Sequence, residues 1–228
     1  MNDDTNPRPP GGRRIALAGA TGLVGQALLR GLLDEPSVAS VLALVRRPLT
    51  VTHPKLELLV VDFAQLAPLP PVEEVYLALG TTIRVAGSQD AFRAVDFDAN
   101  LAVARAARAA GARRLGLVSA MGADAHSRVF YNRVKGELEE AVAGLGFETV
   151  VVAGPSLLVG DRAALGQPAR RGEHLFLRAS RWLRPLVPAN LRPIAAADVA
   201  AALRQRVPEA QGLVRLASGA MQGASIRR

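Results

Sequence analysis

Residues 14–25 read Arg14-Ile15-Ala16-Leu17-Ala18-Gly19-Ala20-Thr21-Gly22-Leu23-Val24-Gly25. An apolar run ends in three glycines spaced G-x-x-G-x-x-G, and an amphipathic run follows, which predicts a strand, a tight turn and a helix. Gly19 allows a sharp turn, Gly22 lets the backbone approach a pyrophosphate, and Gly25 lets the helix pack closely on the strand. The free amides and positive dipole end of such a helix attract phosphate. Glycine turns also occur as simple connectors between a strand and a helix, so the rest of the chain must show whether this turn binds a nucleotide.

The composition predicts one large globular domain. The chain has 228 residues, of which half are apolar and none is cysteine, so disulfides and thiol chemistry are excluded. Residues 1–12 are polar and without a hydrophobic signal region, and we expect a disordered tail followed by a single domain over 13–228. The longest apolar run, 149–160, is shorter than the roughly 20 residues that cross a bilayer. A cytosolic setting without membrane contact is therefore the expectation.

The net charge of +8 comes almost entirely from arginine, since the chain has only two lysines. These arginines are scattered and not interleaved with aromatic residues, so we expect no nucleic-acid partner. One denser group consists of Arg170, Arg171, Arg178, Arg181, Arg184 and Arg192. A solvated helix face is the favoured interpretation of this group, and a surface for an acidic ligand or partner is the alternative.

Strand and helix patterns alternate along most of the chain. Apolar runs suited to buried strands recur at 40–45, 56–61, 74–79, 115–118, 147–153 and 212–216, and helical patterns at about 90–110, 128–145, 173–183 and 196–206. Residues 84–89 and 154–160 are expected to be loops. The alternation predicts an α/β fold, a Rossmann-like doubly wound parallel sheet that binds ligands at the carboxyl ends of its strands. The chain from about 154 to 228 would form a small region that covers the substrate.

Several polar groups follow directly after predicted strands. Arg46 and Arg47 stand where an acidic residue would hold the ribose of NAD, and they suit a 2′-phosphate instead, which favours NADP(H); two merely exposed arginines are the alternative. Asp62 either meets the adenine amino group or caps the turn that follows. The stretch Leu79-Gly80-Thr81-Thr82 contains a glycine and two small hydroxyl residues, so this part of the chain can pass under a dinucleotide without a clash.

A second group of residues carries the chemistry of proton transfer. Ser119 ends the fifth predicted strand, and Tyr131 and Lys135 lie one turn apart on the next helix. The pKa of a free phenol is about 10, and a neighbouring ammonium group favours the phenolate, so Tyr131 is suited to act as a general acid or base. Ser119 is expected to hydrogen-bond the same substrate oxygen, and Lys135 to bind the nicotinamide ribose. The alternative, an ordinary helix tyrosine beside a surface lysine, is disfavoured because each residue type occurs only twice in the chain.

Residues 14 to about 203 resemble the extended or atypical short-chain dehydrogenases/reductases. The likeness is carried by the glycine turn, Ser119, Tyr131 and Lys135, and more narrowly by Leu79–Thr82, Phe92–Asp96, Val118–Asp124 and Tyr131–Glu137, which are similar to the Tat-interacting oxidoreductase-like proteins and their small bacterial relatives. The resemblance implies NADP(H) at the glycine turn and at Arg46 and Arg47, a Ser–Tyr–Lys catalytic set, Pro155 near the nicotinamide, and a possible homodimer. Gly154 departs from the pattern, because relatives often carry arginine before this proline.

Three functions fit this pattern. The favoured one is an NADP(H)-dependent oxidoreductase that reduces a small carbonyl compound or oxidises the corresponding alcohol. A non-catalytic NADP(H)-binding sensor or partner-binding protein is the second. A nucleotide-sugar epimerase or dehydratase is the third, and it is disfavoured by the short segment after Gly154. We expect no metal site, because His53, His126 and His174 are dispersed along the chain. Asp198 is expected to cap a helix.

Overall fold

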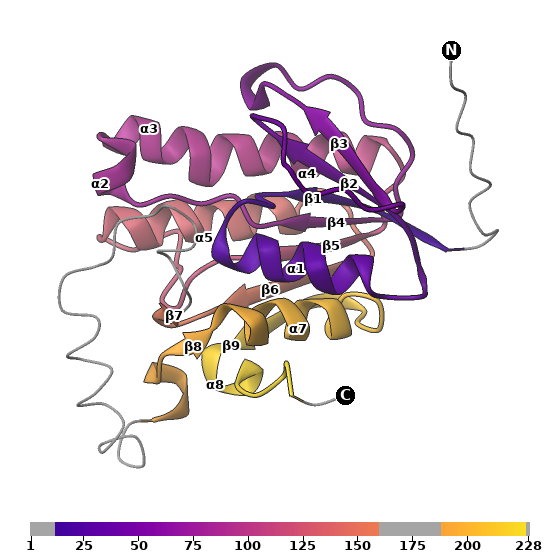
Figure 1. The fold of residues 1–228 in the computed structure, drawn as a ribbon. Helices are drawn as coiled ribbons and strands as arrows, with labels where there is room; N and C mark the ends of the chain where they lie inside the picture. Colours follow the sequence, from indigo (N-terminus) through magenta and orange to yellow (C-terminus); the bar gives the residue numbers. More distant parts are fainter. Residues whose placement is uncertain (1–11, 160–187, 227–228) are drawn as a thin grey trace.

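The computed structural model describes residues 12–159 and 188–226 (Figure 1). The predicted tail, apart from Gly12, lies outside the described residues. So do the helix predicted over 173–183 and five of the six clustered arginines, all except Arg192.

Seven parallel strands form the central sheet in the order β3-β2-β1-β4-β5-β6-β9. Their bounds are β1 (Arg13–Ala18), β2 (Val38–Val45), β3 (Leu56–Val60), β4 (Glu74–Leu77), β5 (Arg114–Val118), β6 (Thr149–Gly154) and β9 (Gly212–Ala217). The strand order reverses between β1 and β4, and the crevice at such a switch point is where open α/β sheets bind their ligands. The predicted doubly wound parallel sheet is confirmed.

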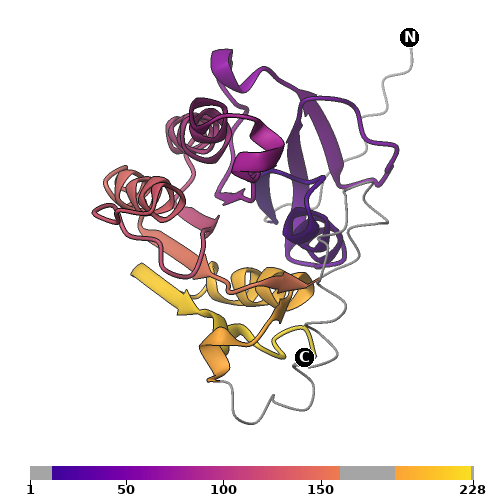
Figure 2. The ribbon, with the colours of Figure 1, turned by 90° about the vertical axis from the view of Figure 1, so that its left-hand side faces the viewer.

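Helices cover both faces of this sheet (Figures 1 and 2). On one face α1 (Leu23–Leu33) and α7 (Ala196–Arg206) pack against the side chains of Ile15 and Leu17. On the other face α4 (Asn100–Ala109) and α5 (Phe130–Ala143) share a second core with Ala16 and Ala18. Successive residues of β1 thus enter different cores, which explains why this strand is apolar throughout.

The helix predicted over 90–110 is one continuous but irregular helix. It begins as α3 (Gln89–Arg93), widens into a π-helical segment over Ala94–Ala99, and continues as α4. The loop predicted over 84–89 is only partly correct, because α2 (Ile83–Ala86) forms a short helix there. The hydroxyl of Thr82 accepts a hydrogen bond from the Val85 amide at 3.2 Å and so starts this turn.

The C-terminal region departs from the prediction at two places. Gly154 still belongs to β6, and β7 (Leu158–Val159) pairs with β8 (Ile194–Ala195) in a separate two-stranded sheet, so 154–160 is not simply a loop. Asp198 does not cap α7: its carboxylate accepts a hydrogen bond from the Ser225 amide at 3.1 Å.

Short elements complete the described chain: η1 (Phe63–Gln65), η4 (Ala189–Leu191) and α8 (Ser218–Met221). Within the described residues, no helix is both long enough and apolar enough to cross a membrane.

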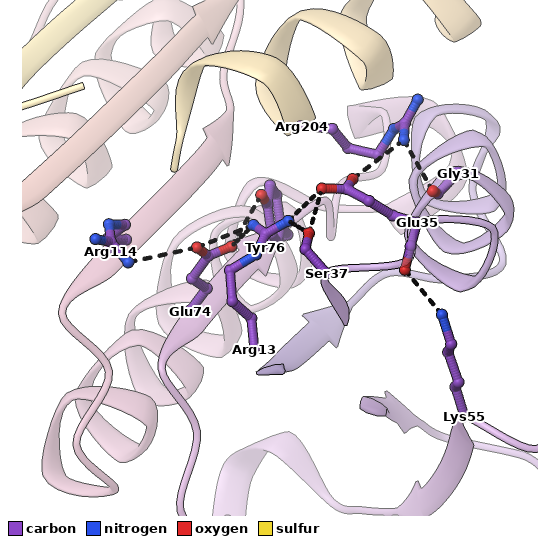
Figure 3. A network of polar contacts seen from close by, with 9 residues as sticks. All are labelled: Arg13, Gly31, Glu35, Ser37, Lys55, Glu74, Tyr76, Arg114 and Arg204. Carbon is purple, nitrogen blue, oxygen red and sulfur yellow. Dashed lines mark hydrogen bonds and ion pairs between the residues drawn. The ribbon is translucent and has the colours of Figure 1, made fainter. Parts of the chain in front are cut away.

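A partly buried polar network lies at the amino ends of the strands (Figure 3). Glu74, fully buried at the start of β4, accepts hydrogen bonds from Arg13 at 2.9 Å and from the Tyr76 hydroxyl at 3.3 Å. Arg13 also pairs with Glu35 after α1, and Glu35 pairs with Arg204 of α7 at 3.4 Å. Burial, and then the charge of Glu74, raise the pKa of the Tyr76 phenol well above its usual value. These contacts join the first half of the sheet to α7, on the edge opposite the candidate site.

Candidate active site

The glycine turn and the end of β4 meet at the switch point. Gly19 has a φ of +93°, and a Cβ added there would lie 2.6 Å from the Leu79 amide nitrogen. A Cβ on Gly25 would lie 2.6 Å from the Gly19 carbonyl carbon. Both positions therefore require glycine because the protein's own backbone occupies the space that a side chain would need.

Gly22 is different from these two glycines. Its φ is −81°, which any residue can adopt, and an added Cβ would find its nearest neighbour at an ordinary 3.5 Å, the Gly19 carbonyl oxygen. Neither conformation nor internal packing explains a glycine here. An approaching ligand that needs bare backbone would explain it, as the pyrophosphate interpretation requires.

The start of α1 offers backbone donors. Gly22 is the N-cap, no side chain caps the helix, and its first turn contains no acidic residue. The side chains of Ala20 and Val24 are buried in the core, while Thr21 is exposed and Leu23 half-buried. The first-turn amides, which lack acceptors within the helix, are therefore suited to bind an anion.

Arg46 and Arg47 lie beside this turn. Both are exposed directly after β2, and Leu44 of β2 is paired with Ala18 at the end of β1. Neither arginine forms an ion pair with a residue in the part of the chain that the structure describes. The arrangement fits a bound phosphate at the glycine turn.

Asp62 has a local role. Its Oδ1 accepts a hydrogen bond from the Ala64 amide at 2.9 Å and caps η1. The capping interpretation is therefore the one that the geometry supports, and contact with adenine stays a prediction.

The loop after β4 is held from the helix side. The Thr81 amide donates to Asp96 Oδ2 at 2.8 Å, and Asn100 Nδ2 donates to the Leu79 carbonyl at 3.2 Å. Gly80, between them, is exposed, and a Cβ on it would lie 3.9 Å from Lys135 Nζ. The predicted dinucleotide loop and the predicted catalytic lysine are thus brought together.

Lys135 is buried on α5, and its Nζ lies 2.7 Å from Asp96 Oδ1. Both side chains are at most 5 % exposed. A buried ammonium group without a counter-charge is strongly unfavourable, so this pairing makes the position of the lysine possible. Sequence reasoning gave Asp96 no role, although a carboxylate within the Phe92–Asp96 run of a long amphipathic helix was the signal available.

Tyr131 lies one turn before Lys135 on α5 and is half-buried. Its ring packs against the fully buried ring of Phe92, with the centroids 5.5 Å apart. The loop before α5 packs closely against this helix, since a Cβ on Gly136 would lie 2.6 Å from Asp124 Cα. The phenol is therefore held by packing, and its hydroxyl makes no hydrogen bond with the residues that the structure describes.

Ser119 does not point where the sequence analysis expects. It is buried at the end of β5, and its hydroxyl donates to Glu139 Oε1 of α5 at 2.5 Å. Arg215 Nε of β9 donates to the other oxygen of Glu139 at 3.2 Å. A serine has one hydroxyl hydrogen, so while this bond stands Ser119 has none for a substrate oxygen. The hydroxyl is therefore directed to α5, and its expected donation to a substrate oxygen stays a prediction.

Pro155 is buried just after β6, and its carbonyl accepts a hydrogen bond from the Met121 amide at 2.9 Å. This bond ties the loop after β5 to the end of β6. A Cβ on Gly154 would meet only ordinary contacts, the nearest being the Ala120 carbonyl oxygen at 3.5 Å. The departure from arginine at this position therefore has no steric cause.

Comparison with known proteins supports the fold and corrects one expectation. The model of a family described as NAD(P)H-binding matches residues 19–152. The protein named fmp52, mitochondrial, of Emericella nidulans is 37 % identical over 175 residues, covering 72 % of this chain and 75 % of its own length. Its namesake in Coccidioides immitis is 33 % identical over 227 residues, covering 90 % and 92 %. These relatives are named as mitochondrial, which contradicts the cytosolic expectation. That expectation rested on the absence of cysteine and of a secretory signal, and neither feature distinguishes a cytosolic protein from a mitochondrial one.

Solved structures share the fold at low identity. An oxidoreductase of the short-chain dehydrogenase/reductase family from Burkholderia thailandensis is similar with a TM-score of 0.65 and 19 % identity, covering 95 % of both chains. The protein MoeE5 in complex with UDP-glucose and NAD is similar with a TM-score of 0.65 and 18 % identity, covering 90 % of this chain and 76 % of MoeE5. The chain belongs to the NAD(P)H-binding family and has the Rossmann fold of the short-chain dehydrogenases/reductases.

Proposed function

We propose that this protein is an NADP(H)-dependent reductase of a small carbonyl compound. The observation that carries the proposal is the position of Lys135. Its ammonium group is buried one helical turn from Tyr131, beside Gly80 of the loop at the switch point. A lysine that served only the fold would not need to face the open loop on which a dinucleotide would lie.

The cofactor would be held by groups of three kinds. The first-turn amides of α1 and the bare backbone of Gly22 would bind the pyrophosphate. Arg46 and Arg47 would bind a 2′-phosphate, because guanidinium groups match phosphate in charge and in geometry. The exposed face of Gly80 and the ammonium group of Lys135 would receive the nicotinamide ribose.

When bound, the reduced nicotinamide supplies a hydride to the carbonyl carbon. Tyr131 donates its phenolic proton to the carbonyl oxygen, and the phenolate regains a proton from solvent. Lys135 stabilises the negative charge that this transfer leaves on the phenolate. Ser119, whose hydroxyl donates to Glu139, would fix the end of β5 and would have no role in binding the substrate; the hydrogen bond to Glu139 supports this assignment.

The loop that precedes Tyr131 favours an apolar substrate. Met121 and Val129, in the loop that leads from β5 to Tyr131, are 44 % and 58 % exposed. Apolar side chains near a hydrogen-bond donor suit a molecule that has one polar acceptor, such as a carbonyl oxygen, and an apolar body. Apolar aldehydes, ketones and quinones are therefore the first compounds to screen.

A non-catalytic dinucleotide-binding sensor is the second candidate. The hydrogen bond from Ser119 to Glu139 favours it, because the substrate oxygen would lose one of its two expected donors. The Tyr131→Phe variant separates the two functions. A reductase would lose turnover and keep NADPH affinity, whereas a sensor would show no turnover in either protein.

The first experiment is a titration of the purified protein with NADPH and with NADH, followed by cofactor fluorescence. We expect tighter binding of NADPH, and a preference that disappears in the Arg46→Ala/Arg47→Ala variant. The Arg105→Ala/Arg206→Ala variant is the matched control, since both arginines are exposed and the net charge changes equally. Binding of neither nucleotide would refute the proposed function. Equal binding of both would refute the assignment to NADP.

A further inference from the structure

Asp96 is a buried carboxylate in the middle of the π-helical segment Ala94–Ala99. A π-helical turn is wider than an α-helical turn, leaves weaker backbone contacts and occurs frequently at functional sites. Here the turn is supported by Asn100, whose Nδ2 donates to the carbonyls of Val95 and Asp96 at 3.2 and 3.1 Å. The irregular turn is thus specifically stabilised at the place where Asp96 enters the interior.

The two oxygens of Asp96 have different partners. Oδ2 accepts from the Thr81 amide at 2.8 Å, and Oδ1 lies 2.7 Å from Lys135 Nζ. One carboxylate therefore joins the loop after β4 to α5. Hydrogen bonds to an ionised acceptor are stronger than neutral ones and more demanding in geometry.

The loop is held on both sides of Gly80. Thr81 is bound by Asp96, and the Leu79 carbonyl is bound by Asn100. A Cβ on Gly80 would lie 3.5 Å from Asp96 Oδ1 and 3.9 Å from Lys135 Nζ. The backbone of Gly80 and the ammonium group of Lys135 are consequently neighbours, and Asp96 contacts the elements that carry both.

We propose that Asp96 is a positioning residue that couples the loop at 79–81 to Lys135, so that the nicotinamide half of the cofactor meets a single preformed surface. The inference rests on the proposed function, because it assigns Asp96 an effect on cofactor binding that it exerts through Lys135 and Thr81. Removing the charge of Asp96 leaves an acceptor for the Thr81 amide and takes the counter-ion from Lys135. The nicotinamide half should then be bound less well, while the site for the adenine half, formed by α1 and β2, is unaffected.

The test compares Asp96→Asn with Asp98→Asn. Asp98 lies two residues away in the same π-helical segment and is exposed, so the control makes the same chemical change outside the contact. Affinity is measured for NADPH and for 2′,5′-ADP, which lacks the nicotinamide half. For Asp96→Asn we expect NADPH to bind about tenfold more weakly and 2′,5′-ADP to change by less than about twofold. For Asp98→Asn we expect neither affinity to change.

A second variant covers the case in which Asp96→Asn does not fold. Asp96→Asn/Lys135→Met contains no buried charge without a partner at this position, so it should fold and bind 2′,5′-ADP like the wild type. It should still bind NADPH about tenfold more weakly. NADPH affinity equal to that of the wild type in either variant, or an equal loss for both nucleotides in a folded variant, overturns the inference. If the inference is overturned in this way while the wild type binds NADPH, the proposed function survives. If the wild type binds neither NADPH nor 2′,5′-ADP, the inference and the proposed function both fail.

Discussion

Gly136 lies inside α5 and Gly144 directly follows this helix, and we predict that alanine destabilises the protein at Gly136 but not at Gly144. Alanine in place of glycine inside a helix ordinarily stabilises it by about 1 kcal/mol. At Gly136 a Cβ would lie 2.6 Å from Asp124 Cα, in a direction blocked by backbone and not by a flexible side chain. The Asp124 carbonyl carbon and the Ala125 amide nitrogen would lie closer still, so the loop before α5 would have to move by more than about 1 Å to reach ordinary contact distances.

Such overpacking costs about 1–3 kcal/mol, and more where backbone must move. The upper part of that range exceeds the gain in helix propensity, so we expect Gly136→Ala to lose about 1–2 kcal/mol net. For a domain of this size the loss corresponds to a fall in Tm of about 2–4 °C per kcal/mol. Because the loop leads directly to Tyr131, the variant should also lose reductase turnover.

Gly144→Ala is the matched control. Gly144 follows α5 with a φ of −77°, and an added Cβ would meet only ordinary contacts, the nearest at 3.6 Å. We expect this variant to be unchanged or stabilised by up to about 1 kcal/mol. Thermal and urea unfolding of both variants test the reasoning. A Gly136→Ala protein as stable as the Gly144→Ala protein would refute the claim that the loop is packed on the helix as described.

Three further predictions concern single side chains. Gly22→Ala should change the free energy of unfolding by less than about 0.5 kcal/mol, because nothing internal opposes it, and should weaken NADPH binding about tenfold, as a titration would show. Burial and the charge of Glu74 raise the pKa of Tyr76, so the folded state favours the neutral phenol; this contribution is complete below pH 10 and is lost as the pH rises further, by about 1.4 kcal/mol per pH unit. Urea unfolding between about pH 9 and 11 should therefore show a shallower decline for Tyr76→Phe, and equal slopes would contradict this. Ser119→Ala should cost about 1 kcal/mol of stability through the lost bond to Glu139 and leave reductase turnover within about tenfold, and a far larger loss of turnover would restore Ser119 to the catalytic set.

Local patterns in the sequence were sufficient for the seven strands of the central sheet and their main covering helices, but not for α2 or the pair of β7 and β8. The strand, turn and helix around Gly19 follow from side-chain periodicity and glycine spacing over a dozen residues. The placement of Tyr131 and Lys135 one turn apart follows from the helical repeat. The edge of the sheet that carries the candidate site follows from topology, because all the strands that precede these residues are parallel. Each of these inferences depends only on neighbours in the chain or on a general rule of chain connection.

Tertiary structure alone decided the partners of the buried polar groups. Asp96 pairs with Lys135 and accepts from the Thr81 amide, the Ser119 hydroxyl donates to Glu139, and Asp62 accepts from the Ala64 amide. The sequence by itself determined the fold class, the glycine turn and the residues that meet at the carboxyl edge of the sheet. It did not determine these pairings, because hydrogen bonds and ion pairs depend on side-chain directions to within an ångström, and those directions are set by packing between segments that lie far apart in the chain.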